Sequence, residues 1–140
     1  MEPTKTNQIT PDKILQIGMG FWASKTLLTA VNMSLFTHLA HNPMSGREIR
    51  KTLGLKKRSL YDFLDTLVAL GFLNRKGLKE SAIYSNAPET DLFLDKNKLS
   101  YIGGMLEMSN NRLYPFWNDL EEGLKTGKPQ NETKNGGAPI

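Results

Sequence analysis

Apolar and polar positions between Ser45 and Ala87 follow the pattern of two helices and then two short strands. Ser45 with Glu48 three residues later forms a capping-box pattern, so a helix begins there and ends at Gly54. A second helix carries apolar residues at i, i+3, i+4, i+7 and i+8, and it ends at Gly71. The residues of this apolar stripe are Leu60, Phe63, Leu64, Leu67 and Val68.

A β-hairpin is predicted to follow the second helix. Phe72 and Leu73 indicate one strand, residues 75–77 a turn, and residues 82–84 the returning strand. The order of helix, tight turn, helix and hairpin is typical of a winged helix-turn-helix. The expected fold class is therefore mainly α, with a small β-hairpin wing and extra N- and C-terminal helices for dimerisation.

One long helix is predicted before this unit, with Thr10 as the N-cap, Pro11 as the first helical residue, and an end near Val31. Its apolar residues cover more than one face, which near a chain end favours burial against another subunit. Gly18 and Gly20 cost about 1 kcal/mol each relative to alanine inside a helix. Either another backbone or a ligand approaches closely there, or the helix is slightly kinked.

Shorter helices are predicted before and after the central unit. The chain is expected to consist of a loose tail (residues 1–9), one domain (10–126) and a linker (127–140). Ser34 is expected to cap one helix and Asn86 another. The first of these helices is predicted to end at Asn42-Pro43, the second to hold residues 92–94 and the third to cover 99–110. The last is predicted to begin at Tyr114, pass through Leu124 and stop at Gly127 and Pro129.

Composition excludes several classes of protein. The absence of cysteine rules out disulfides, cysteine-ligated zinc and a cysteine nucleophile, and it agrees with a reducing cytoplasm. His38 and His41 have no carboxylate motif around them, so no metal site is expected. No run of about 18 apolar residues occurs, so we expect no membrane span.

The basic surplus lies in the central unit. The chain has a net charge of +4, whereas residues 45–87 hold nine basic and four acidic residues, a net +5. A winged-helix DNA-binding transcriptional regulator is therefore an alternative, with cations at the start of the second helix and at the wing tip: Lys56, Lys57, Arg58, Arg75, Lys76 and Lys79. Asp62 and Asp65 oppose it, because they project from the polar side of that helix. A plain solvated surface is the third interpretation.

No catalytic constellation is visible. No serine lies in a nucleophile elbow, and no glycine-rich loop follows a predicted strand. These patterns alone indicate a binding or assembly module.

Several segments in order resemble a known family: GFWASKTLLTAVNMSLFTHLA, LYDFLDTLVALGFL, YSNAPETDLFL, YIGGMLEM and LYPFWNDLEEGLKTGKPQNE. Together they resemble the N-terminal dimerisation domain of S-adenosylmethionine-dependent small-molecule O-methyltransferases, the group that includes acetylserotonin and caffeic acid O-methyltransferases. The resemblance covers roughly Ile14 to the chain end, and the PFWNDLEEGLKTGKP segment is its most specific part.

This resemblance implies that the winged helix binds no specific nucleic acid and that the first helix intertwines with a second subunit. It also implies that the S-adenosylmethionine fold and a catalytic histidine base follow on the C-terminal side, with residues 127–140 as a linker toward this absent catalytic domain. Because the sequence ends at Ile140, we expect this chain to lack the cofactor site and the base, and to methylate nothing by itself. S-adenosylmethionine is then the cofactor of the parent enzyme.

The apolar excess of the first helix predicts a dimer interface, and the resemblance implies a substrate cavity. We expect a cytoplasmic homodimer without a membrane partner, whose interface holds Phe21, Trp22, Leu27 and Leu28. An apolar cavity, open on one side, is expected to receive a small aromatic or polyketide-like acceptor. Its lining residues would be Met105, Met108, Phe116 and Trp117, with Met19 or Trp22 from the partner chain. The alternative that all of these are simply core residues stays open.

Overall fold

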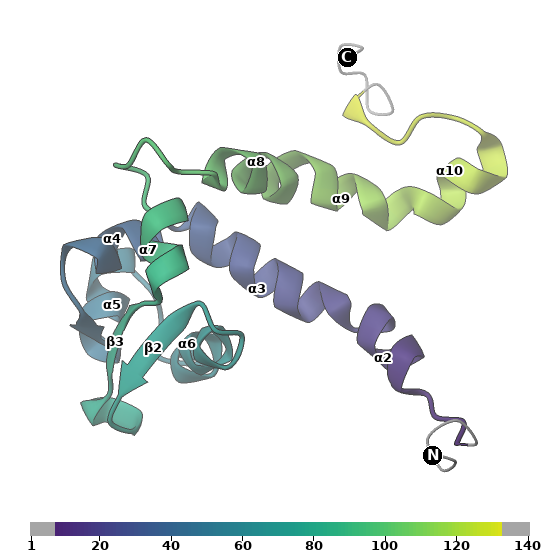
Figure 1. The fold of residues 1–140 in the computed structure, drawn as a ribbon. Helices are drawn as coiled ribbons and strands as arrows, with labels where there is room; N and C mark the ends of the chain where they lie inside the picture. Colours follow the sequence, from purple (N-terminus) through teal and green to yellow (C-terminus); the bar gives the residue numbers. More distant parts are fainter. Residues whose placement is uncertain (1–7, 133–140) are drawn as a thin grey trace.

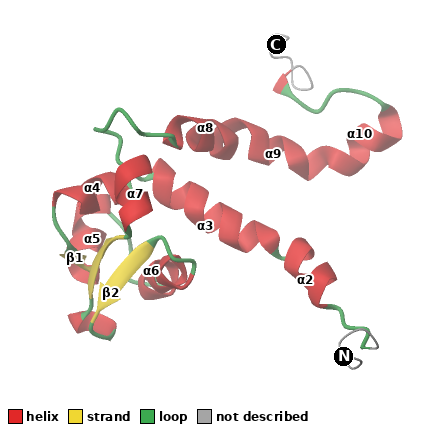
Figure 2. Ribbon diagram, viewed as in Figure 1, coloured by secondary structure: helices red, strands yellow, loops and turns green. Residues whose placement is uncertain are grey.

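The computed structural model describes residues 8–132 as a small body from which two helical arms extend (Figure 1). The body contains three helices, α4 (Leu35–His41), α5 (Gly46–Leu53) and α6 (Leu60–Ala69). It also contains an antiparallel sheet in the order β1 (Met44–Ser45), β3 (Ile83–Asn86), β2 (Leu73–Lys76), shown in yellow in Figure 2. The mainly helical class with a small sheet is confirmed.

The two arms are defined as follows. The N-terminal arm consists of α2 (Asp12–Gly18) and α3 (Gly20–Asn32). The linking helix α7 (Pro88–Phe93) leads from the sheet to the C-terminal arm. That arm contains α8 (Gly103–Met108), a π-helical turn (Ser109–Leu113), α9 (Tyr114–Phe116), a 3₁₀ turn (Trp117–Asp119) and α10 (Leu120–Thr126). α8 contacts α3, and the arms then separate toward α2 and α10 (Figure 1).

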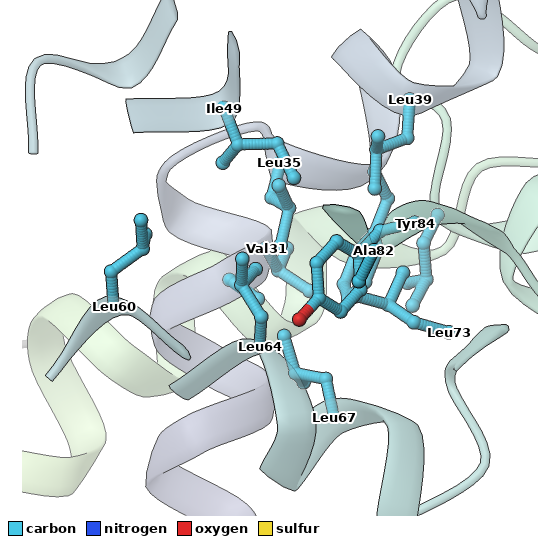
Figure 3. Packing of buried hydrophobic residues seen from close by; sticks show 13 residues of the cluster. Val31, Leu35, Leu39, Ile49, Leu60, Leu64, Leu67, Leu73, Ala82 and Tyr84 are labelled. Atoms are coloured by element: carbon cyan, nitrogen blue, oxygen red, sulfur yellow. The ribbon is translucent and has the colours of Figure 1, made fainter. Parts of the chain in front are cut away.

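The core of the body joins all of its elements (Figure 3). The predicted stripe of α6 supplies Leu60, Leu64 and Leu67, which are 4% exposed or less. α3, α4, α5 and the sheet supply the remaining residues: Ala30, Val31, Leu35, Phe36, Leu39, Ile49, Leu73, Ala82 and Tyr84, with Leu94 after α7. The C-terminal end of α3 is therefore fixed in the core, whereas α2 buries no residue.

The helix-end signals in the central unit are confirmed. The Glu48 backbone N–H donates to Ser45 Oγ (3.2 Å), and the Ser45 backbone N–H donates to Glu48 Oε1 (2.9 Å), so the capping box is complete. Gly54 and Gly71 adopt φ values of +70° and +88°, which side chains disfavour, and they end α5 and α6.

The predicted long N-terminal helix is broken. α2 ends at Gly18 and α3 begins at Gly20, with Met19 between them at φ −98° and ψ 6°. Two glycines around one residue weaken the helix there, which agrees with the kink interpretation. Pro11 occupies the N-cap without a side-chain hydrogen bond, so the prediction of Thr10 in that position is wrong.

The predicted helix boundaries in the C-terminal arm are also wrong. Residues 95–102 form a loop, and helix begins only at Gly103. The Ile102 backbone N–H donates to the Phe93 carbonyl (2.9 Å), which folds this loop back onto α7. No break precedes Tyr114, because the π-helical turn joins α8 to α9.

Two predicted caps have other roles. Ser34 has φ +62° and makes no capping bond; its Oγ accepts a hydrogen bond from Lys96 Nζ (2.6 Å). Asn86 ends β3, and its Nδ2 donates to the Phe36 carbonyl (2.8 Å) and to Asp91 Oδ1 (3.0 Å).

The hairpin differs in detail from its prediction. Arg75 and Lys76 belong to β2 rather than to a turn, and a 3₁₀ turn (Lys79–Ser81) lies in the connection to β3. The third strand, β1, was not predicted; its Met44 lies opposite Tyr84. Of the predicted tail and linker, residues 1–7 and 133–140 lie outside the described residues.

Candidate functional site

The N-terminal arm leaves large apolar side chains exposed. Trp22 is 61%, Phe21 48% and Met19 43% exposed, and the two aromatic rings meet edge to face at 5.6 Å. The other exposed apolar residues of this arm are Ile14, Leu15 and Ile17. In a single chain nothing among residues 8–132 covers this apolar face.

The four residues expected at a dimer interface fall into two groups. Phe21 and Trp22 lie on the exposed face. Leu28 is only 5% exposed, and Leu27 is half-buried against the core of its own chain. Both pairs lie in α3, and the burial of its C-terminal part separates Leu27 and Leu28 from the exposed pair.

The C-terminal arm has a second apolar face. Met105 is 72%, Trp117 67% and Met108 41% exposed, and Phe116 is half-buried. Further exposed apolar residues on this arm are Leu113, Leu120 and Leu124. The expected substrate-lining residues are thus accessible rather than enclosed by their own chain.

Phe116 and Trp117 line one open apolar cavity of about 430 Å³. Its other walls come from the same arm and from the chain that folds back beside α10: Leu113, Leu120, Gly123, Leu124, Lys128, Gln130 and Asn131. Arg112 Nε donates to Glu132 Oε1 (2.6 Å) and fixes this return. Gly123 leaves room for Gln130, whose side chain would lie 3.1 Å from an added Cβ.

The structure does not bring all expected pocket residues together. Met105 and Met108 do not line this cavity, and neither do Met19 and Trp22 of the same chain. Trp22 lines a separate shallow groove with Phe21 and Phe63, between α3 and α6.

Polar contacts hold the arms together where they meet. Lys25 Nζ donates to Asn110 Oδ1, and it lies 4.9 Å from the centroid of the Tyr114 ring. Asn111 Nδ2 donates to Asn32 Oδ1 (3.1 Å). Sequence reasoning missed these residues, and the adjacent asparagines before Tyr114 are the only signal that could have indicated them.

The start of the C-terminal arm is fixed by a half-buried phenol, that of Tyr101. The Tyr101 hydroxyl donates to Glu107 Oε2 (2.6 Å), and burial together with this carboxylate raises the pKa of Tyr101 above its ordinary value. An added Cβ at Gly103 would lie 2.2 Å from the Tyr101 ring, so glycine is required for this packing.

Residues 12–32 have the length and apolar composition of a membrane-crossing helix. Within this stretch, 17% of the most apolar window is buried inside the protein. Core helices and signal sequences share those two properties. The burial of Leu28, Ala30 and Val31 shows that the C-terminal end of this stretch is part of the folded body.

The described residues hold apolar surfaces and an apolar cavity, but no cluster of metal ligands. Residues 8–132 contain no group of three or more His, Asp or Glu side chains that could hold a metal ion. Within residues 8–132 no glycine-rich loop follows a strand to open a helix, and Gly18, Gly103 and Gly104 lie at helix ends.

Comparisons with known proteins agree with this arrangement. Residues 15–96 match the model of the O-methyltransferase dimerisation domain. The chain is 40% identical over 126 residues to the tetracenomycin polyketide synthesis 8-O-methyl transferase TcmO of Streptomyces glaucescens, covering 90% of this chain and 36% of TcmO. It is 27% identical over 124 residues to acetylserotonin O-methyltransferase of Gallus gallus, covering 87% and 36%.

Solved structures show the same fold. Human N-acetylserotonin methyltransferase in complex with SAM aligns with a TM-score of 0.82 at 20% identity, over 95% of this chain and 39% of that one. The chain spans little more than a third of the length of these relatives. Since the family model covers more than half of its residues, the chain belongs to the O-methyltransferase dimerisation domain family.

Proposed function

We propose that this chain is the dimerisation and acceptor-binding domain of an S-adenosylmethionine-dependent O-methyltransferase that acts as a homodimer. The observation that carries the proposal is the pair of exposed apolar faces on the two arms, with Trp22 on one and Trp117 on the other. A second copy of the chain would remove the face of the N-terminal arm from water, which is favourable in proportion to the apolar area buried.

The first test is the mass of the chain in solution. Sedimentation velocity at tens of micromolar should give a dimer that dissociates on dilution. A monomer at that concentration would contradict the dimerisation part of the proposal.

The acceptor part rests on the 430 Å³ apolar cavity beside Trp117. Its size is in the range of small-molecule sites, and its aromatic wall suits a planar aromatic or polyketide-like acceptor. Met105 and Met108 would contact the acceptor from the same arm, and Met19 or Trp22 would do so from the partner chain. We propose that the catalytic part of the whole enzyme completes this site.

Fluorescence can test the acceptor site by itself. The chain has two tryptophans, so Trp22→Phe leaves Trp117 as the only indole. Titration with 2-naphthol should quench Trp117 saturably, and Leu124→Asp in the cavity wall should abolish saturation. Leu99→Asp, at a fully exposed loop position, is the control and should leave quenching unchanged. Linear quenching in all variants would contradict the acceptor site without affecting dimerisation.

We further propose that α5, α6 and the hairpin form a winged helix that has no DNA-reading role. Arg75 supports this, because its Nη1 pairs with Asp65 Oδ1 (2.9 Å) and is not free for a phosphate. Anisotropy against a random duplex pool should show only weak, salt-sensitive binding. Nanomolar binding of one sequence at physiological salt would contradict this and favour a regulator.

S-adenosylmethionine enters the proposal as the cofactor of the whole enzyme, at residues other than 8–132. The relatives support this role: PigF of Serratia is named as an S-adenosyl-L-methionine-dependent methyl transferase and is 30% identical to this chain over 115 residues. The same proposal assigns residues 10–126 to one domain and the residues from 127 on to a linker. It also includes a cytoplasmic location, which the cysteine-free sequence favours.

A further inference from the structure

A basic cavity lies on the body, lined by residues of α5, the loop after it, the start of α6 and the 3₁₀ turn of the hairpin. Its volume is about 370 Å³. It is lined by Arg47, Arg50, Lys57, Leu60, Tyr61 and Glu80. Three cations and one carboxylate give this lining a net charge of +2, and the cavity shares no residue with the apolar cavity of the C-terminal arm.

The hydrogen-bond donors that line this cavity are free to bind a ligand. Arg50 is half-buried, yet within residues 8–132 neither Arg50 nor Arg47 forms an ion pair with a carboxylate. Lys57 pairs with Glu80 only loosely, at 3.8 Å, and both side chains are about three-quarters exposed. An unpaired guanidinium at the wall of a cavity favours an anionic ligand, because its planar fork matches phosphate oxygens.

Tyr61 adds a neutral donor and a flat face. Its ring packs directly over the backbone of Gly46, where an added Cβ would lie 2.5 Å from the ring and 2.9 Å from the hydroxyl oxygen. The Tyr61 hydroxyl makes no hydrogen bond to any residue of the described stretch. Glycine at position 46 therefore allows the phenol to lie at the cavity wall beside the arginines.

We propose that Arg47, Arg50, Lys57 and Tyr61 bind the phosphate or diphosphate group of a small soluble molecule. The cavity volume is at the lower end of small-molecule sites, which suits a compact anion. The site is concave, and the neighbouring Asp62 on α6 opposes an extended polyanion such as DNA. The two arginines would donate paired N–H bonds, and Glu80 would be released from Lys57 when the anion binds. This proposal does not depend on the proposed methyltransferase role.

The test is calorimetric titration of the whole chain with inorganic diphosphate at low salt, with inorganic phosphate as a weaker second ligand. Arg50→Ala is expected to weaken binding at least about tenfold, and Arg47→Ala severalfold. Lys51→Ala is the matched control, because it removes the same charge from the next position on α5 but does not line the cavity; it should change affinity less than about twofold.

Two further variants separate binding from folding. Arg50→Lys keeps the charge but removes the fork, so its affinity should lie between those of the wild type and Arg50→Ala. Glu80→Gln removes the competing carboxylate and should strengthen binding severalfold, a gain that a folding defect cannot produce.

Titration with a 20-base-pair DNA duplex tests the alternative that these cations bind nucleic acid. Diphosphate binding that Arg50→Ala leaves unchanged, or that Lys51→Ala weakens equally, would overturn the proposal. So would duplex binding tighter than diphosphate binding, with its losses spread evenly over Lys51, Lys56 and Arg58, since that pattern would assign these cations to a nucleic-acid surface.

Discussion

The Tyr84 hydroxyl donates a 2.8 Å hydrogen bond to Asp65 Oδ1, which joins the middle strand of the sheet to α6. Tyr84 is fully buried, and its burial and the Asp65 carboxylate raise the pKa of this phenol above its ordinary value. Arg75 pairs with the same oxygen of Asp65 at 2.9 Å. Asp65 thus joins α6 to the sheet through Tyr84 and Arg75.

Removing this hydroxyl should destabilise the domain. Tyr84→Phe leaves Asp65 with Arg75 only, so we expect a loss of about 1–2 kcal/mol in the free energy of unfolding. Urea denaturation measures it. Tyr61→Phe is the control, because the Tyr61 hydroxyl has no bond within residues 8–132, and its effect should stay within about 0.5 kcal/mol. Equal effects of the two variants would show that the Tyr84–Asp65 bond contributes nothing.

Two adjacent glycines at the start of the C-terminal arm should respond oppositely to alanine. Gly103→Ala forces the Tyr101 ring away and breaks its 2.6 Å bond to Glu107, so we expect a loss of about 1–3 kcal/mol in the free energy of unfolding. Gly104→Ala meets no atom within 4 Å and should stabilise α8 by up to about 1 kcal/mol. Thermal unfolding of both variants decides this, and a stable Gly103→Ala protein would contradict the packing argument.

Protonation of Asp91 should account for part of the loss of folding stability at acidic pH. Hydrogen bonds from Lys98 Nζ (2.8 Å) and Asn86 Nδ2 (3.0 Å) lower the pKa of Asp91 in the folded state. Its contribution is therefore complete above the unfolded-state pKa of about 4, and it is lost as pH falls through the lower folded-state pKa. Urea titrations between pH 2 and pH 7 should show a smaller pH dependence in both Asp91→Asn and Lys98→Met. An unchanged dependence in both would contradict this assignment.

Local patterns in the sequence predicted the central body well. The capping box at Ser45, the αL glycines and the Leu60–Val68 stripe each depend on residues within one or two turns, and all three are confirmed. The strand β1 could not be predicted in this way, because its two residues become a strand only by pairing with Tyr84 and Ile83, about 40 positions away.

The arms were harder to predict for the same physical reason. The late start of α8 depends on the Tyr101 ring packing over Gly103 and on the Ile102–Phe93 bond, neither of which appears as periodicity. The exposure of Trp22 and Trp117 agrees with the expected sites, whereas the burial of Leu28 follows from the anchoring of α3 in the body. A stripe of apolar residues does not tell which neighbour covers it.

The central claim is that the exposed face of the N-terminal arm is buried in a homodimer. Light scattering at tens of micromolar, applied to Trp22→Glu and to Leu99→Glu, tests it most directly. Both variants place a carboxylate at an exposed apolar position, 61% and 109% exposed, but only Trp22 lies on the arm. We predict a monomer for Trp22→Glu, because a charge buried at an apolar interface is strongly unfavourable, and a dimer for Leu99→Glu and the wild type. A monomeric wild type, or a Trp22→Glu protein that stays dimeric, would contradict the account.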